Sequence, residues 1–227
     1  MLNEINRKTL FALLFLFVLS FTAVAQQSPS PDSTESRFFV GIGLNITHYP
    51  IMGNLVKYKY FGGIKPFVNI NYGYRLSKRA TIQLGIGYGA NEINGSYGRY
   101  VSADTTYEVA DYQHIRGIVL PVTLKLTPFN PNRRLQLYAN ASLAPIFGHI
   151  KAKATESFEG NTTVVYDEQS PTFDIVATAG LTLNYKISKR LDGYVDGILF
   201  YKNLNFQRPA RRFYEHKSVG IGINYNL

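Results

Sequence analysis

Residues 218–227 read SVGIGINYNL. Large apolar or aromatic side chains occupy every second position from Val219 to Leu227, and serine, glycine or asparagine occupies the positions between them. Such strict alternation predicts a β-strand whose two faces meet different environments. The second face is small and uncharged, whereas a water-facing strand would normally carry lysine, glutamate or arginine. We expect this strand to pair along both of its edges, because an unpaired edge promotes aggregation.

The composition of the 227 residues narrows the function classes. Cysteine is absent, which excludes disulfides, thiol catalysis, cysteine-based metal sites and a lipoprotein anchor. The formal net charge is +9, but the lysines and arginines are scattered through expected turns and loops. Nucleic-acid binders gather such residues on one helix or stripe, so we expect no nucleic-acid partner. Tyrosine and phenylalanine are abundant, which favours strands.

The first residues have the pattern of a secretory signal peptide. Arg7 and Lys8 precede an apolar stretch at 9–22, and Ala23 and Ala25 form a small-residue cleavage motif. The stretch is shorter than the roughly 20 apolar residues that a spanning helix needs. We therefore predict Sec-type export with cleavage near Ala25. The Pro/Ser-rich residues 26–36 are predicted to be a flexible periplasmic lead-in, and 37–227 the folded domain.

The rest of the chain resolves into eight alternating segments. The expected strands are 37–47, 66–76, 81–89, 118–127, 135–143, 173–186, 191–202 and 218–227. Three tight turns alternate with four longer connections, which include polar loops predicted at 91–113 and 151–170. Pro121 lies inside the fourth strand and predicts an edge or a bulge there. Short and long connections in alternation are typical of an antiparallel up-and-down barrel.

The two faces of these strands indicate which side of the barrel meets lipid. Large aliphatic residues form one face, and Gly, Asn, Thr, Ser and Gln dominate the other. Small polar residues suit the narrow interior of an eight-stranded barrel, and an aliphatic outer face suits a membrane. A soluble lipocalin-like barrel is the alternative. Tyrosines near the ends of the apolar runs predict aromatic belts: Tyr72, Tyr74, Tyr88, Tyr185, Tyr201 and Tyr225. We predict an all-β, eight-stranded antiparallel up-and-down transmembrane β-barrel.

Four segments carry a resemblance to a known family: GIGLN at 41–45, YRLSKR at 74–79, RGIVLPVTLKLTP at 116–128 and GIGINYNL at 220–227. Together they resemble the small outer-membrane β-barrel families of Gram-negative bacteria, in particular the PorT-like domain. The resemblance implies location in the cell outer membrane and insertion by the barrel-assembly machinery. It permits a part in protein secretion or envelope assembly. The resemblance covers nearly all of 38–227 and identifies no chemistry.

The predicted topology also assigns an orientation and a charged interior. Short turns of outer-membrane barrels face the periplasm, which places Lys78, Arg79, Arg133, Arg134, Lys189 and Arg190 on the periplasmic rim. Six charged residues face the predicted lumen: Arg75, Lys125 and Lys186, and Asp174, Asp192 and Asp196. Charges inside a narrow barrel must be paired or hydrated. We expect a salt-bridged plug that stiffens the barrel, with a narrow polar channel as the alternative.

The predicted outer rim holds the remaining candidate residues. The histidines map to strand ends beside long loops: His48, His114, His149 and His216. A rim-histidine hydrolase acting on lipid or peptide would also need a neighbouring nucleophile. Three arginines of the last loop are candidate contacts for lipopolysaccharide phosphates: Arg208, Arg211 and Arg212.

The predicted function is that of an integral outer-membrane barrel with a structural or interaction role at the cell envelope. We expect a monomer without catalysis, cofactor or metal. Its expected partners are outer-membrane lipid, lipopolysaccharide and, during insertion, the assembly machinery.

Overall fold

The computed structural model describes residues 36–54, 59–102, 105–205, 211–212 and 218–227. The predicted signal peptide and all but the last residue of the lead-in lie outside the described residues. Within the described ranges, no helix is long and apolar enough to cross a membrane.

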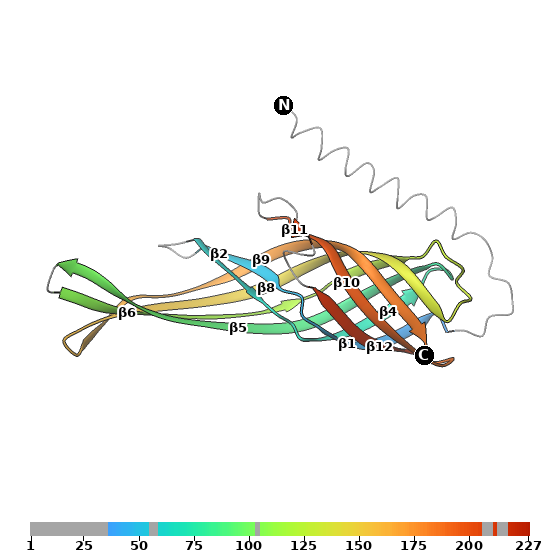
Figure 1. The fold of residues 1–227 in the computed structure, drawn as a ribbon, viewed down its shortest axis with the longest axis horizontal. Coiled ribbons are helices and arrows are strands. Elements are labelled where there is room, and N and C mark those ends of the chain that lie inside the picture. The colour runs from blue at the N-terminus through green and yellow to red at the C-terminus, as the bar shows by residue number, and fades with distance from the viewer. Residues whose placement is uncertain (1–35, 55–58, 103–104, 206–210, 213–217) are drawn as a thin grey trace, which may run out of the picture. The chain divides into compact units, whose positions relative to one another are not determined.

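Eight strand positions close into an antiparallel ring, which confirms the predicted fold class (Figure 1). In ring order they are β1 (Phe38–Asn45), β4 (Val68–Arg75), β5 (Ala80–Ser102), β6 (Thr105–Val119) with β7 (Val122–Leu126), β8 (Leu135–Phe158), β9 (Asn161–Lys186), β10 (Leu191–Asn203) and β12 (Val219–Asn226). The terminal strand β12 pairs with both β1 and β10, as its alternation predicted. This pairing is the seam of the barrel.

Pro121 divides one ring position into β6 and β7. Both strands pair with β5 and β8, so together they occupy a single place in the ring. Proline has no N–H to donate to the ladder, and the strand is interrupted at Leu120 and Pro121. Backbone hydrogen bonds still join the interruption to both neighbouring strands. The Leu120 N–H donates to the Pro145 carbonyl at 3.0 Å, and the Gly85 N–H donates to the Pro121 carbonyl at 2.7 Å. The predicted edge or bulge is wrong, because both strands are paired on two sides and the register on β5 and β8 continues across Pro121 without a shift.

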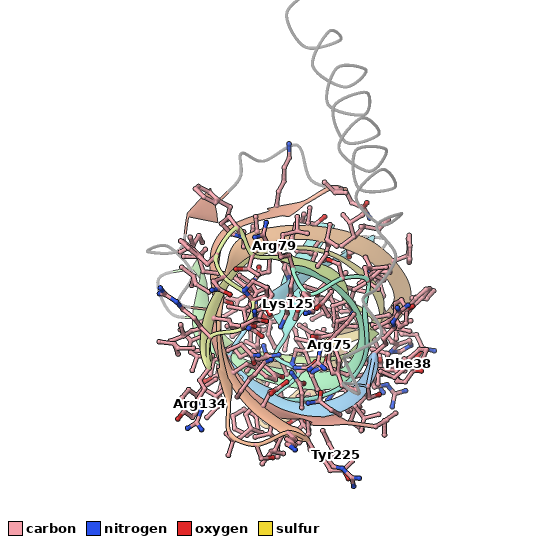
Figure 2. The ribbon with its side chains drawn as sticks, turned by 90° about the vertical axis from the view of Figure 1, so that its right-hand side faces the viewer. Phe38, Arg75, Arg79, Lys125, Arg134 and Tyr225 are labelled. Atoms are coloured by element: carbon pink, nitrogen blue, oxygen red, sulfur yellow. The ribbon has the colours of Figure 1, made fainter. Side chains whose placement is uncertain are left out.

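Three tight turns lie together at one end of the barrel, which we call the turn end. In the two Ser-Lys-Arg turns the serine Oγ accepts a backbone N–H two residues ahead, from Arg79 to Ser77 at 3.1 Å and from Arg190 to Ser188 at 3.2 Å. The repeated sequence thus forms the same local geometry twice. Figure 2 looks along the barrel from this end, with Arg75 and Lys125 inside the ring and Phe38, Arg134 and Tyr225 outside it.

The predicted polar loops at 91–113 and 151–170 are wrong, because both segments are paired strands. The β5–β6 ladder continues to Ser102 opposite Thr105, and the β8–β9 ladder continues to Phe158 opposite Asn161. The second hairpin turns through Glu159 (φ 47°) and Gly160 (φ 83°), a two-residue turn with positive φ at both positions. Polarity here reflects side chains that meet water, while the backbone hydrogen bonds of a long hairpin form regardless of polarity.

These extensions form a four-stranded projecting sheet, composed of 90–102, 105–117, 148–158 and 161–172. Figure 1 shows β5, β6, β8 and β9 running on past the other strands of the barrel.

The first long connection contains a separate hairpin, β2 (Tyr49–Asn54) with β3 (Lys59–Ile64). Ile51 and Ile64 of this hairpin have no exposed surface. They pack in one apolar cluster with inward-facing residues of the wall strands. This cluster, which we call the cap, consists of Tyr49, Ile51, Ile64, Ile115, Val119, Ala144, Ile146, Ile150 and Val176. It fills the barrel interior at the end opposite the turns.

A bulge in β10 changes which side chains reach lipid. The register of β10 on β9 shifts between Ile198 and Phe200. Beyond the shift Phe200 is 52% exposed, whereas Tyr201 packs against the cap. The prediction of Tyr201 as a belt residue is therefore wrong, because a bulge moves every later side chain to the opposite face.

Candidate functional site

The turn half of the lumen holds a charged cluster contributed by three strands. The Arg75 guanidinium of β4 lies 2.9 Å from the Asp192 carboxylate of β10, whose side chain is only 4% exposed. The same Arg75 Nη2 donates to the Asn226 side chain of β12 at 2.8 Å. The Asn226 amide in turn donates to Asp192 at 3.4 Å. Strands that are far apart in sequence are thus linked across the lumen by hydrogen bonds to charged groups.

A second ion pair lies deeper in the lumen. Lys125 Nζ is 3.4 Å from Asp196 Oδ1 and 4.8 Å from the centre of the Tyr194 ring. The Thr182 hydroxyl donates to the same Asp196 oxygen, and the Asn71 amide donates to the Tyr194 hydroxyl at 3.2 Å. The Lys125 charge therefore meets both a carboxylate and an aromatic face.

The six predicted lumen charges occupy three levels of the lumen. Arg75 and Asp192 are at the turn level, where Lys186 lies opposite Asp192 in the β9–β10 register. Lys125 and Asp196 are at the middle level. Asp174 is 1% exposed and accepts hydrogen bonds from Asn203 at 3.2 Å and Asn205 at 3.3 Å, near the cap.

Glycines make room for the large Tyr194 side chain. A Cβ on Gly43 would overlap the Tyr194 hydroxyl, and a Cβ on Gly222 would overlap both the hydroxyl and the ring. Because the interior of an eight-stranded barrel is just wide enough for side chains, one tyrosine lying over the neighbouring strands requires such gaps in them. Gly222, the cross-strand partner of Tyr194 in the β10–β12 register, is therefore explained by this packing.

A polar cavity of about 100 Å³ lies in the middle of the lumen, with lining residues that include Tyr49, Asn71, Gln83, Lys125 and Asp196. This volume suits several water molecules, each of which needs roughly 10–15 Å³ on this measure. Burial raises the pKa of the Tyr49 hydroxyl to about 12, and the nearby Asp196 charge adds to the effect. The hydroxyl therefore stays neutral at physiological pH.

The three histidines that the structure describes do not gather into one site. His114 Nδ1 is 2.9 Å from Glu92 Oε1 on the projecting sheet. His149 lies opposite Arg116 in the β6–β8 register, and the His48 ring lies beside Gly63. The placement of His114 and His149 at strand ends is wrong, because their strands continue past them. His216 lies outside the described residues.

In the part of the chain that the structure describes, His114 meets a carboxylate, and no cluster suited to a metal ion is found. Among the described residues, no three His, Cys, Asp or Glu side chains form a group that could hold a metal ion. The partner of His114 is the carboxylate of Glu92, which is 56% exposed, where a hydrolase would need a hydroxyl nucleophile.

The predicted lipopolysaccharide contact remains a prediction. Arg208 lies outside the described residues. The backbone of Arg211 and Arg212 forms the short strand β11 (Arg211–Arg212), which pairs with Tyr201 and Phe200 of β10, but the side chains of β11 are not described.

Sequence reasoning missed the cap and the roles of Tyr194 and its glycines. The hairpin had a signal, because Ile51 and Ile64 flank a stretch with glycines at 53, 62 and 63. The alternation of strand 191–202 places Tyr194 on the lumen face with Asp192 and Asp196, but its packing against Gly43 and Gly222 depends on strands distant in sequence.

The chain matches the model of the outer membrane protein beta-barrel domain family over residues 11–227. Similar solved structures include Ail, the attachment invasion locus protein of Yersinia pestis, with 13% identity and a TM-score of 0.41. Others are the N-terminal β-barrel domain of Pseudomonas aeruginosa OprF, with 12% identity and a TM-score of 0.35, and the Neisserial surface protein A, with 12% and 0.33. Each match covers 86% of this chain and 100% of the other.

No curated protein matches the chain. The family match extends over most of the sequence and includes every strand of the ring. The chain is therefore an outer membrane protein and belongs to the outer membrane protein beta-barrel domain family.

Proposed function

We propose that this protein is a closed outer-membrane barrel that holds its projecting sheet outside the cell and has a structural or interaction role there, without catalysis. The observation that carries the proposal is that side chains obstruct the lumen on both sides of its central polar cavity. Ion pairs lie at the turn and middle levels, and the cap lies beyond them. Such an interior suits a stiff anchor better than a conduit.

The orientation follows the rule that short turns face the periplasm. The projecting sheet then faces the exterior, on the same side as the cap. Its base is held by the cap residues Ile115 and Ile150, which have no exposed surface. Farther out, side chains such as Ile93, Tyr97 and Val164 are 44%, 55% and 53% exposed. A paired sheet with exposed apolar and aromatic residues is suited to contacts with other envelope components.

Export and assembly complete the proposal. Sec-type export with cleavage near Ala25 delivers the chain to the periplasm, and the barrel-assembly machinery inserts it as a monomer. Outer-membrane lipid is then the main partner of the barrel wall.

Conductance across planar bilayers tests whether the lumen is blocked to ions. We expect the full chain to give no discrete conductance steps. A matched variant should conduct, in which 49–64 is replaced by a Gly/Ser linker and Lys125 and Tyr194 are replaced by alanine. Heat-modifiable gel mobility of both proteins establishes that each is folded. Discrete steps from the unaltered chain would instead support the narrow polar channel.

A further inference from the structure

The outer part of the projecting sheet has the opposite charge from the rest of the chain. We call this part, residues 93–113 and 153–168, the distal sheet. It contains seven of the fifteen acidic residues but only two basic ones, Arg99 and Lys153, so its net charge is −5. The formal net charge of the whole chain is +9, which leaves +14 for the other residues. A negative field on a projecting element attracts cationic molecules and repels nucleic acids and anionic polysaccharides.

The distal sheet contains an open groove where its two hairpins separate. The β6–β8 ladder ends at Glu108 opposite Ser157, and beyond this pair the hairpin ends diverge (Figure 1). The groove, which we call the fork groove, has a volume of about 670 Å³, and its lining includes two carboxylates, Glu108 and Glu159, and two aromatic residues, Tyr97 and Phe158. The other lining residues are small: Ser96, Gly98, Ser157, Gly160 and Thr162. Small residues leave room for a long side chain to enter between the acidic and aromatic ones.

The two carboxylates of the fork groove are exposed and lack a cationic partner among the described side chains. Within that part of the chain, no Lys, Arg or His nitrogen lies within 4.0 Å of Glu108 or Glu159. Asp111 of the same sheet differs, because it accepts a hydrogen bond from the Tyr166 hydroxyl at 3.2 Å. The fork groove therefore presents two negative charges that a cation from outside the protein can neutralise.

The aromatic residues of the groove are held in place by packing within the sheet. The Phe158 ring stacks on the Tyr107 ring of β6, with the ring centres 4.9 Å apart. Tyr97 lies opposite Val109, which is 5% exposed, while Tyr97 itself is 55% exposed. Aromatic rings attract ammonium and guanidinium groups, and carboxylates bind the guanidinium fork with two hydrogen bonds.

These two kinds of group favour an organic cation over a metal ion. Ca²⁺ takes about six to eight oxygen ligands and gains nothing from an aromatic ring. Arginine and lysine side chains use both a carboxylate and an aromatic face, and their long stems fit a groove with small residues at its base.

We propose that the fork groove binds an arginine or lysine side chain of a basic polypeptide outside the cell. The negative field of the distal sheet attracts the polypeptide, and the groove holds one of its cationic side chains between Glu108 and Glu159. Tyr97 and Phe158 supply the aromatic contacts. This inference names a partner for the proposed interaction role, and it rests on the proposed orientation, which places the projecting sheet outside the cell.

The test measures the affinity of a defined basic peptide for the folded protein. The full chain is folded in neutral detergent and titrated into a fluorescein-labelled peptide of alternating arginine and serine, and fluorescence anisotropy reports binding. The salt concentration is about 0.15 M, at which exposed charges farther apart than roughly 8 Å are screened. A peptide of the same length with glutamine in place of arginine is the neutral probe. We expect the arginine peptide to bind and the glutamine peptide to bind at least about tenfold more weakly.

The groove variant replaces Glu108 and Glu159 with glutamine. Its matched control, Asp167→Asn with Glu168→Gln, removes the same charge from positions of the distal sheet that do not line the groove. An exposed ion pair contributes up to about a fivefold effect on binding. We expect the groove variant to bind the arginine peptide about tenfold more weakly and the control less than about threefold more weakly. Tyr97→Ser, which removes an aromatic face, should weaken binding about two- to fivefold.

Three results would overturn the proposal. Equal losses in the groove variant and the control would indicate diffuse attraction to an acidic sheet. Equal binding of the arginine and glutamine peptides would show that no cationic side chain is recognised. Displacement of the peptide by Ca²⁺ in the unaltered chain but not in the control would identify a divalent-cation site instead.

Heat-modifiable gel mobility establishes that each variant is folded. If the groove variant does not fold, the single substitutions Glu108→Gln and Glu159→Gln replace it, each with an expected loss of about threefold. Absence of peptide binding by a non-conducting barrel contradicts the groove and leaves the closed anchor intact. A conducting barrel that binds the peptide contradicts only the closed anchor.

Discussion

In the turn half of the lumen the side chains that meet are charged or amide groups, whereas in the cap they are almost all aliphatic. Arg75 and Asp192 represent the first region, and Ile146 and Ile51 represent the second. The same wall strand contributes to both. On its inward face β8 presents Asn140, which donates to the Thr182 hydroxyl at 2.9 Å, and then Ile146, which is fully buried.

The difference shows that one inward face serves two kinds of packing. Within the ring the partners across the lumen are other wall strands, and buried charges are tolerated there because each meets an opposite charge or a hydrogen-bonding group. At the cap the partner is a hairpin that excludes water, so close-packed aliphatic side chains stabilise it. Substitutions should therefore act through unpaired charge in one region and through cavities in the other.

The largest effect is expected from separating Arg75 and Asp192. Asp192→Ala should lower the free energy of unfolding by about 4 kcal/mol, because it leaves the Arg75 charge without its carboxylate. Removing both charges, as Arg75→Met with Asp192→Leu, should cost less than Asp192→Ala alone. Urea unfolding in lipid vesicles, followed by gel mobility, measures both. A double variant less stable than the single one would mean that the pair is not linked in this way.

A smaller difference, in the loss of unfolding free energy, should distinguish the substitution of a cap residue from that of a lipid-facing residue. Ile146→Ala should cost about 4 kcal/mol, which combines the lost transfer energy with a cavity term. Ile118→Ala removes the same groups from a side chain that is 42% exposed on the lipid-facing side, where lipid chains fill the space. It should therefore cost about 2 kcal/mol. Equal losses for the two substitutions would show that the cap is not closely packed.

The smallest effect is expected where the polar lumen is tightest. Gly43→Ala places a methyl group against the Tyr194 hydroxyl and should cost about 1–3 kcal/mol through overpacking. Adding Tyr194→Phe removes the overlapping hydroxyl and should recover part of this loss. Thermal midpoints of the gel mobility shift for the two variants and the unaltered chain provide the comparison. If the second substitution adds to the loss, the overlap with Tyr194 is not the cause.

The alternation in strands such as 37–47 and 218–227 was sufficient to predict the ring, its closure and the inward direction of Arg75, Lys125 and Asp192. The alternation led to wrong predictions in two places. The polar segments 91–113 and 151–170 are paired strands, because each segment folds back on itself as a hairpin. Tyr201 turns inward because of a bulge that no alternation marks.

Except beyond the bulge in β10, the amino-acid sequence by itself determined which side chains of the wall face lipid and which face the lumen, since a period of two residues follows from the geometry of an extended chain. It also determined the tight turns and the closing pair of strands. Only the tertiary structure decided which lumen charges meet and that the β2–β3 hairpin caps the interior. Those features depend on the register between strands distant in the chain, and the ladder of the closed ring sets that register as a whole.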